Sequence, residues 1–232
     1  MKPNLLAFDT SSSILSLALQ TSMGSSFEQF DFGLLHQELL AARVDGITKI
    51  HSLNLKDLHG IICSRGPGSF TGLRIGMAFA TGLSYGLRVP VISVPTLDAM
   101  AESMNTHCHS GYVLALIDGK KQRFFWGLYQ MVNTKWISCL GPGDNSIEDI
   151  GIKVNQFVSQ HGKDQLLHIT SPWGTNYFNL LSPHFQLALG AYGSAQNLAE
   201  YLLRLGTKKF DLQEFDEPNQ GIQYLRPSQA EE

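Results

Sequence analysis

Short apolar runs separated by polar turns open this chain and predict a sheet. Residues 4–20 read as two apolar strands joined by a polar turn over residues 9–13, which is typical of a hairpin. Apolar and polar residues alternate imperfectly over residues 26–32, and we expect a third strand there. Residues 36–52 change to a helical period, with four side chains on one face: Leu40, Val44, Ile47 and His51. The opening pattern therefore predicts a three-stranded meander followed by an amphipathic helix.

Strands and helices alternate through the rest of the chain. We expect strands over residues 58–65, 91–94, 112–118, 123–131, 135–140 and 166–170, and helices over residues 71–87, 96–104, 146–160 and 194–205. The tail from Lys208 onward is polar except for Tyr224 and Leu225. Two successive groups of strands and helices predict an α/β protein with mixed layers in two related halves.

Composition adds the expectation of a partner. Only 16% of the 232 residues are charged and 43% are hydrophobic, whereas about 25% charged residues is typical of a globular domain. A surface this poor in charge suggests that part of it is reserved for another protein. The net charge of −3 and the pI near 6.2 lack the basic character, a pI above about 9, of a domain that holds nucleic acid by itself.

Targeting and cysteine patterns point to the cytoplasm. Asp9 interrupts the first apolar run before a signal peptide could form, and no stretch has the roughly 20 apolar residues of a membrane helix. The three cysteines are an odd number at irregular spacing, which favours neither a disulfide framework nor a structural zinc site. We therefore expect a cytoplasmic protein that does not contact a membrane.

The segment over residues 65–76, Arg-Gly-Pro-Gly-Ser-Phe-Thr-Gly-Leu-Arg-Ile-Gly, carries the most information. Its glycines permit tight turns or close backbone approach, and Ser69 or Thr71 could cap the helix that follows. A glycine-rich loop at a helix N-terminus can hold a phosphate, but this spacing fits neither a P-loop nor the dinucleotide-binding fingerprint. A tight structural turn is the reading we prefer.

The helix expected after this segment has two distinct faces. Small residues recur every four positions at Gly72, Gly76 and Ala80, and a bulky apolar row lies beside them: Ile75, Phe79, Leu83 and Leu87. One face suits the chain's own sheet. The other suits a second subunit, and we expect both contacts.

Several motifs together resemble the TsaB (YeaZ) family. They are Asp9-Thr10-Ser11, His36-Gln37-Glu38, the block Arg65–Gly76, Val94-Pro-Thr-Leu-Asp98, and Ile117-Asp118 before Phe125-Trp-Gly-Leu-Tyr129. The likeness covers roughly residues 4–130 and is most specific in the glycine block. Beyond Tyr129 it is faint, apart from residues 224–227.

The resemblance implies the two-lobed actin-like ATPase (ribonuclease H-like) fold, with an N-terminal lobe over residues 1–106 and a more divergent C-terminal lobe over residues 107–232. It also implies a non-catalytic scaffold subunit. Such a subunit binds and activates the paralogous transferase TsaD in forming N6-threonylcarbamoyladenosine at tRNA position 37. The ATPase TsaE would join the pair, tRNA would bind through the complex only, and the chain would form a homodimer when its partner is absent.

Site residues follow from the same resemblance. The helices over residues 36–52 and 71–87 would form the partner interface, with ten candidate residues: His36, Leu40, Val44, Ile47, Gly72, Ile75, Gly76, Phe79, Ala80 and Leu83. The paralogue's metal-binding histidine pair falls on Thr96 and Met100, so we expect neither a metal site nor that catalysis.

Two rival interpretations stay open. Asp9, Thr10 and Ser11 match the place where actin-like ATPases bind nucleotide with Mg²⁺, which leaves an independent ATP-binding enzyme as one alternative. The other reading of Asp9 is a carboxyl group bonded to its own turn. We expect no cofactor on this chain alone, with ATP or ADP and Mg²⁺ at a subunit junction kept as an alternative. The second rival function is a working homodimer that uses the same helices.

Overall fold

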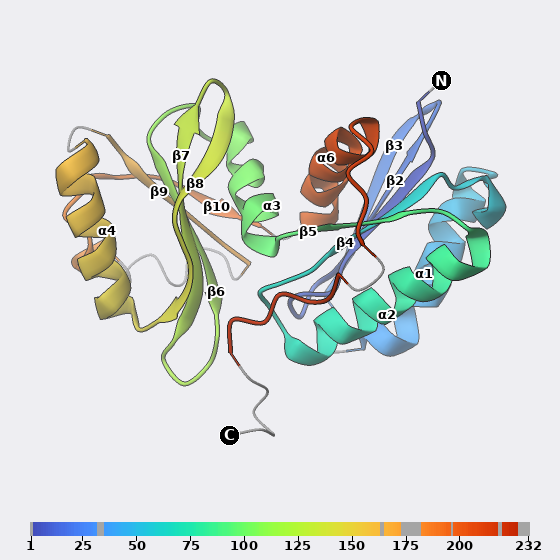
Figure 1. The fold of residues 1–232 in the computed structure, drawn as a ribbon, viewed down its shortest axis with the longest axis horizontal. Helices are drawn as coiled ribbons and strands as arrows, with labels where there is room; N and C mark the ends of the chain where they lie inside the picture. The colour runs from blue at the N-terminus through green and yellow to red at the C-terminus, as the bar shows by residue number, and fades with distance from the viewer. Residues whose placement is uncertain are drawn as a thin grey trace. The chain divides into compact units, whose positions relative to one another are not determined.

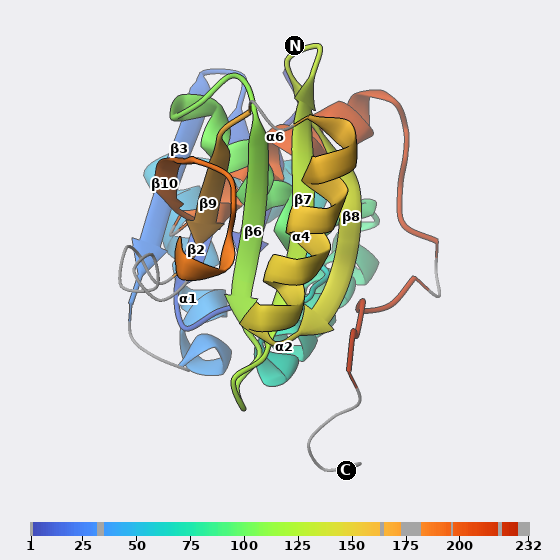
Figure 2. The ribbon, with the colours of Figure 1, turned by 90° about the vertical axis from the view of Figure 1, so that its left-hand side faces the viewer.

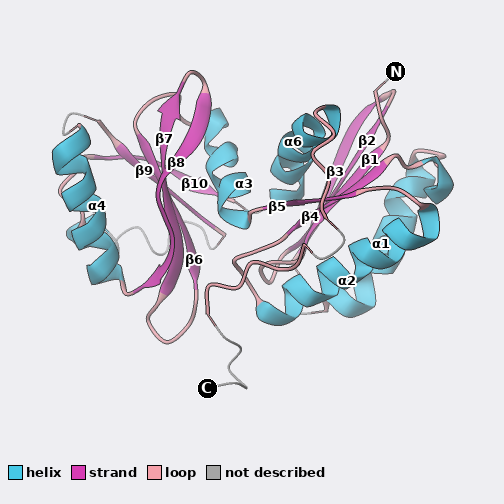
Figure 3. Cartoon of the chain, in the orientation of Figure 1, coloured by secondary structure: helices cyan, strands magenta, loops and turns pink. Residues whose placement is uncertain are grey.

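The chain divides into two compact units. The computed structural model describes residues 2–31, 35–162, 165–172, 182–195, 197–217 and 220–226. One unit comprises Met1–Ala99 with Gln196–Gln223, and the other comprises Met100–Ala195 with Tyr224–Glu232. Each contains a five-stranded mixed sheet with helices packed on it (Figures 1 and 3).

The sheet of the first unit has the strand order β3-β2-β1-β4-β5. Its strands are β1 (Leu5–Asp9), β2 (Leu15–Thr21), β3 (Gly24–Phe30), β4 (Gly60–Ser64) and β5 (Val91–Val94). The first three strands form an antiparallel meander, and β4 and β5 run parallel to β1. Because β1, β4 and β5 are parallel, their carboxyl ends meet at one edge of the sheet, where Asp9 and Ser64 lie.

Helices cover both faces of this sheet. α1 (His36–Ile50) and α2 (Phe70–Leu87) lie on one face, and α6 (Leu198–Asp211) lies on the other (Figure 1). Leu6 and Phe8 belong to the core on the α1–α2 side, whereas Ile62 faces Gly206 of α6. A strand covered on both faces needs apolar residues throughout, which explains why all five residues of β1 are buried.

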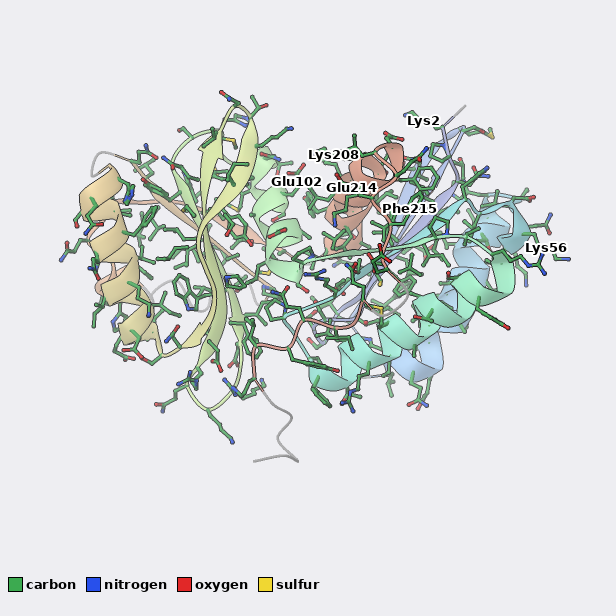
Figure 4. All side chains as sticks on the ribbon, viewed as in Figure 1. Lys2, Lys56, Glu102, Lys208, Glu214 and Phe215 are labelled. Atoms are coloured by element: carbon green, nitrogen blue, oxygen red, sulfur yellow. The ribbon has the colours of Figure 1, made fainter. Side chains whose placement is uncertain are left out.

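The segment after α6 covers the free edge of β5. The amide of Asp216 donates to the Val91 carbonyl at 3.0 Å, and the amide of Ser93 donates to Oδ1 of Asp216 at 2.9 Å. Phe215, labelled with Glu214 in Figure 4, has its ring centroid 5.8 Å from that of Phe210. The segment therefore satisfies an edge that would otherwise offer unpaired backbone groups.

The sheet of the second unit has the order β10-β9-β6-β7-β8. Its strands are β6 (Tyr112–Asp118), β7 (Phe124–Val132), β8 (Lys135–Asn145), β9 (Leu167–Ser171) and β10 (Leu189–Ser194). α4 (Ile147–His161) covers one face, as Figure 2 shows, and packs on an apolar core that includes Trp126 and Val154. The other helices of the described residues are α3 (Thr96–Ser103) and the short η1 (Leu55–Asp57), η2 (Met104–Thr106) and η4 (Ser182–His184). No helix of the described residues is long and apolar enough to cross a membrane.

The two sheets repeat one topology. Read in reverse, the second order is β8-β7-β6-β9-β10, an antiparallel meander followed by two parallel strands, as in the first unit. The predicted mixed α/β fold in two related halves is thus confirmed. The hairpin and the six elements α1, β4, α2, β5, α3 and β6 lie close to their predicted bounds. The third strand begins two residues earlier than expected, and residue 32, its expected end, lies outside the described residues.

The late elements differ from the prediction. The helix expected over residues 194–205 begins at Leu198 and continues to Asp211, and residues 189–194 form β10, which was not predicted. β10 is poor in strand-forming side chains because Gly190 lies against the His168 ring and Gly193 lies against Met104. β8 also extends to Asn145, past the expected end at residue 140.

The expected division at residues 106 and 107 needs a correction. The boundary lies after Ala99, and residues 196–223 return to the first unit instead of joining the second. The reason is α6, whose buried stripe lies against β1, β2, β4 and β5, with the amide of Ala199 donating to Oγ of Ser16 at 2.9 Å. Helix periodicity showed that α6 has an apolar face but not which sheet receives it.

Candidate functional site

The glycine loop after β4 is bonded to the turn that follows β1. The amide of Ser69 donates to the Ser11 carbonyl at 2.7 Å, and Oγ1 of Thr10 donates to the Gly72 carbonyl at 2.8 Å. Oγ of Ser69 caps α2 by accepting from the amide of Gly72 at 3.2 Å. Of the two residues that could cap this helix, Ser69 and Thr71, Ser69 is the one that does so.

Close backbone approach explains the glycines of this loop. A Cβ at Gly68 would lie 2.6 Å from the Ser11 carbonyl oxygen, and a Cβ at Gly72 would overlap the Thr10 carbonyl oxygen. Gly66 has φ +109° and faces the Gln223 carbonyl. The segment is thus the tight structural turn that we preferred, with the chain's own backbone against each of these glycines.

Asp9 lies buried at the end of β1, with 2% of its surface exposed. Burial raises its pKa, although hydrogen bonds from Ser64 and Ser11 and the charge of His36 act in the opposite direction. Its Oδ1 accepts from the amide of Ser11 at 3.1 Å. Asp9 therefore makes the turn contact that was the second reading of this residue, and Thr10 and Ser11 serve the same loop contacts.

His36 joins the start of α1 to this turn. The side chain is 2% exposed, and its Nε2 lies 2.7 Å from the Ser12 carbonyl oxygen. A carbonyl only accepts hydrogen bonds, so Nε2 carries the proton and donates it. His36 thus anchors the helix instead of facing outward.

The positions of the paralogue's histidine pair lie inside the protein. Thr96 and Met100 are both fully buried. In the ranges that the structure describes, no group of three or more His, Cys, Asp and Glu side chains could hold a metal ion. The polar segment His107-Cys108-His109 places only Cys108 inward, with its Sγ 3.6 Å from the Met104 carbonyl oxygen.

The ten candidate interface residues face the interior of the first unit. Seven of them are buried in the core of the first unit: His36, Leu40, Val44, Ile47, Gly72, Gly76 and Ala80. The other three, Ile75, Phe79 and Leu83, are half-buried against the same core. Apolar spacing identifies the most buried face of a helix, and here that face belongs to the chain's own sheet.

The exposed sides of α1 and α2 form a different surface, which we call the outer face. On α2 it comprises Thr71, Arg74, Ala78, Thr81, Gly82, Tyr85 and Gly86, and on α1 it includes Ala41, Ala42 and Ile50. Tyr85 is 90% exposed and Ile50 is 71% exposed. A Cβ at Gly82 or Gly86 would meet no heavy atom of the described residues within 4 Å. The packing of the described residues does not require these glycines. Their exposure indicates a surface for another chain, and the spacing of apolar residues in the sequence did not reveal it.

Charge is almost absent from this part of α2. Between Phe70 and Leu87 the only charged residue is Arg74, whose guanidinium lies 3.9 Å from the centroid of the Phe70 ring. The exposed side of α1, in contrast, carries Glu38, Asp45 and Lys49. The outer face therefore combines small residues and one exposed aromatic ring on α2 with charged residues on α1.

Known proteins resemble the chain in sequence. The profile of the family described as "TsaD: tRNA N6-adenosine threonylcarbamoyltransferase" matches residues 34–199. The Haemophilus influenzae "tRNA threonylcarbamoyladenosine biosynthesis protein TsaB" is 30% identical over 172 residues, which are 73% of this chain and 72% of that protein. The chain belongs to the TsaB family.

A second TsaB matches over a shorter length, and a solved structure shares the fold over nearly the whole chain. The Escherichia coli TsaB is 35% identical over 127 residues, which are 54% of each protein, so the match spans about half the length of that curated relative. The solved structure "YeaZ from Pseudomonas aeruginosa" has a TM-score of 0.80 at 24% identity, over 96% of this chain and 100% of that chain.

The fold extends beyond the family. An activator of the 2-hydroxyisocaproyl-CoA dehydratase from Clostridium difficile has a TM-score of 0.52 at 9% identity, over 94% of this chain and 100% of that chain. This likeness concerns the fold alone. The expected actin-like ATPase fold is confirmed.

Proposed function

We propose that this chain is a non-catalytic scaffold subunit that acts in tRNA threonylcarbamoyladenosine biosynthesis. It binds and activates a TsaD-type transferase that modifies adenosine at tRNA position 37, with a TsaE-type ATPase joining the pair in the cytoplasm. The α2 part of the outer face carries the proposal, because small residues beside an almost fully exposed tyrosine, with a single charge along the helix, are typical of a protein interface. The names of the TsaB relatives supply the pathway.

The partner's surface can be described from the outer face. Gly82 and Gly86 let a second backbone approach α2 closely, and Tyr85 supplies a rigid aromatic ring of the kind that dominates interface energetics. Arg74 favours a carboxylate opposite it. A surface with these properties also suits a second copy of the chain, so we propose a homodimer through the outer face when the transferase is absent.

We further propose that the transferase, and not this chain, supplies the catalytic groups. Thr96 and Met100 are buried and lack the chemistry of a hard-metal site. Oδ1 of Asp9 is bonded to Ser11, and the glycine loop lies against the Ser11 backbone. ATP or ADP with Mg²⁺ is accordingly proposed only at a junction with another subunit. Calorimetry with ATP and Mg²⁺ tests this, since tight binding by the isolated chain would favour the rival ATP-binding enzyme.

A binding experiment tests the outer face. Tyr85→Ala should weaken binding of a TsaD-type transferase by about 2 kcal/mol or more, roughly thirtyfold in Kd, if Tyr85 is an interface hot spot. Ile152→Ala is the matched control, because Ile152 is a similarly exposed apolar residue, 66% exposed on α4 of the other unit. Equal Kd values for both variants would contradict the proposed surface.

Reconstitution of the modification reaction tests the role itself. Product formation by the transferase should depend on this chain and should fall with Tyr85→Ala but not with Ile152→Ala. Light scattering on mixtures should show a heterodimer that replaces the homodimer. Undiminished product without the chain would overturn the scaffold role, and a homodimer that persists in the mixture would support the second rival.

A further inference from the structure

The backbone of β5 faces two ways, toward β4 and toward the free edge of the sheet. The amide of Arg65, which follows β4, donates to the Val94 carbonyl at 3.0 Å, so the carbonyl of Val94 faces β4. Backbone groups alternate in direction along a strand, and those of Val91 and Ser93 therefore face the free edge. Outward groups of this kind must be bonded, or they are open to pairing with another strand.

Asp216 takes the place of a strand residue at this edge. Its amide donates to the Val91 carbonyl at 3.0 Å, and its Oδ1 accepts from the amide of Ser93 at 2.9 Å. A residue of a further parallel strand would donate to the same carbonyl and accept from the same amide through its own backbone carbonyl. The carboxylate of Asp216 stands in for that carbonyl, so a single residue closes this part of the edge.

Two more side chains complete the cover of Ser93, which is fully buried. Nζ of Lys209 donates to the Ser93 carbonyl at 3.4 Å, and Nε2 of Gln220 donates to the Ser93 hydroxyl at 3.3 Å. The amide, the carbonyl and the hydroxyl of Ser93 are thus all bonded by residues from the C-terminal part of the first unit. None of these contacts comes from a strand.

The cover is weaker than a strand would be. Oδ2 of Asp216 is buried and has no hydrogen-bond partner among the described residues. The cost of this unpaired oxygen reduces the free energy that closing the edge gains. Phe215 and Glu217 on either side are exposed, so little apolar burial holds Asp216 in place. The edge should therefore open more readily than the interior strands of the same sheet.

An uncovered β5 edge fits a second copy of itself. Val91 and Ser93 lie on either side of Ile92, and each presents one amide and one carbonyl. In an antiparallel pair related by a two-fold axis at Ile92, Val91 of one copy lies opposite Ser93 of the other, and every outward donor meets an acceptor. The strand Val-Ile-Ser-Val also carries no charge that would oppose this pairing.

We infer that Asp216 guards the edge of β5, and that two copies of the chain pair through β5 when this guard is removed. The guard leaves the outer face as the surface through which the chain associates. The inference does not depend on the proposed function, because it uses only the backbone groups of β5 and the residues that cover them.

Three substitutions at position 216 separate the two bonds. Asp216→Asn keeps the amide and a side-chain oxygen, Asp216→Ala keeps only the amide, and Asp216→Pro keeps neither. Asp211→Ala is the matched control, because Asp211 is an exposed aspartate at the end of α6. Each substitution is made in a Tyr85→Ala chain, in which association through the outer face should be weak.

Amide hydrogen exchange reports directly on the edge. The Ser93 amide should exchange about tenfold faster or more in the Asp216→Ala and Asp216→Pro chains than in the Asp216→Asn and control chains, because it loses a bond to a charged acceptor. Light scattering over a series of protein concentrations should then show a dimer of the Asp216→Pro chain where the Asn and control chains have a lower mass. Protection of the Val91 amide should rise with the concentration of the Pro chain, which places the contact at β5.

Two results would overturn the inference. Equal exchange of the Ser93 amide in all chains would show that Asp216 does not close the edge, and faster exchange with no gain in mass would show that the open edge does not pair. If the Asp216→Pro chain fails to fold, the Asp216→Ala chain supplies both measurements. The Tyr85→Ala chain alone tests the outer face, since a mass equal to that of the wild type would count against the proposed homodimer and leave the comparison at position 216 intact.

Discussion

A substitution at Gly206 tests the placement of α6 on the first sheet. A Cβ at this position would lie 2.6 to 2.7 Å from three side-chain atoms of Ile62 in β4. Ordinary contacts need about 3.5 to 4.0 Å, and Ile62 is a fully buried residue of a central strand. We expect an overpacking cost near the upper end of the usual range, about 3 kcal/mol. The better helix propensity of alanine offsets about 1 kcal/mol of it, so Gly206→Ala should lose about 2 kcal/mol.

The same substitution at Gly82 is the matched control. Gly82 is also inside a helix, but a Cβ there meets no heavy atom of the described residues within 4 Å. Gly82→Ala should therefore gain up to about 1 kcal/mol. Urea unfolding of the isolated chain, at concentrations where it is monomeric, should separate the two midpoints by about 1 M or more for a slope of about 3 kcal/mol/M.

A double variant decides whether Ile62 is the cause. Ile62→Val alone should cost about 0.5–1.5 kcal/mol. Combined with Gly206→Ala it should cost less than the sum of the single effects by more than about 0.5 kcal/mol, because shortening Ile62 gives room to the new methyl group. A Gly206→Ala variant as stable as Gly82→Ala, or strict additivity in the double variant, would refute this account of α6.

Three further predictions concern titratable groups. Burial lowers the pKa of His168, despite a hydrogen bond to the Ser110 carbonyl, and its Nδ1 accepts from the amide of Ala191. The stability that the neutral ring contributes should be full above about pH 6.5 and fall below it. If the urea midpoint of a His168→Gln variant falls between pH 7.5 and 5.5 by as much as that of the wild type, this prediction is contradicted. Burial alone would raise the pKa of Asp144, but hydrogen bonds from Arg226 and Arg123 lower it. The ion pairs should therefore stabilise the fold above about pH 4 and be lost below it. Arg226→Gln should move the midpoint of acid unfolding to higher pH, and an unchanged midpoint would argue against the ion pair. Burial raises the pKa of the Cys63 thiol, so thiol reagents mapped by mass spectrometry should modify Cys63 only after unfolding, and rapid labelling of the native chain would show that β4 opens.

Much of the fold could be predicted from local pattern. The hairpin of β1 and β2 and the parallel strands β4 and β5 are short apolar runs, and the helices α1 and α2 have a period of 3.6 residues. Each lies close to its expected range. β10 and the start of α6 could not be predicted in the same way. The glycines of β10 make sense only with His168 and Met104 beside them, and these neighbours are distant in sequence.

The candidate site shows that residues selected by sequence can lie inside the chain's own core. The resemblance placed Leu40, Val44 and Ile47 at a partner interface, but these residues share the most apolar face of their helix, and that face packs on the chain's own core. The outer face is instead marked by Tyr85 and Gly82, a lone aromatic residue and a glycine that periodicity does not single out. These two residues become interface candidates only because they are exposed, and exposure is a property of the tertiary structure.

The sequence by itself determined the family, the α/β character, the repeated order of strands and helices, and the glycine block that joins β4 to α2. These follow from local periodicity and from residues that one tight turn requires. Only the tertiary structure decided that α6 returns to the first unit, that Asp9 and His36 serve the turn, and that Asp216 closes the free edge of β5. Each of these depends on which distant surfaces meet, and the free energy of burial, unlike the preference for helix or strand, is set by contacts between residues far apart in the chain.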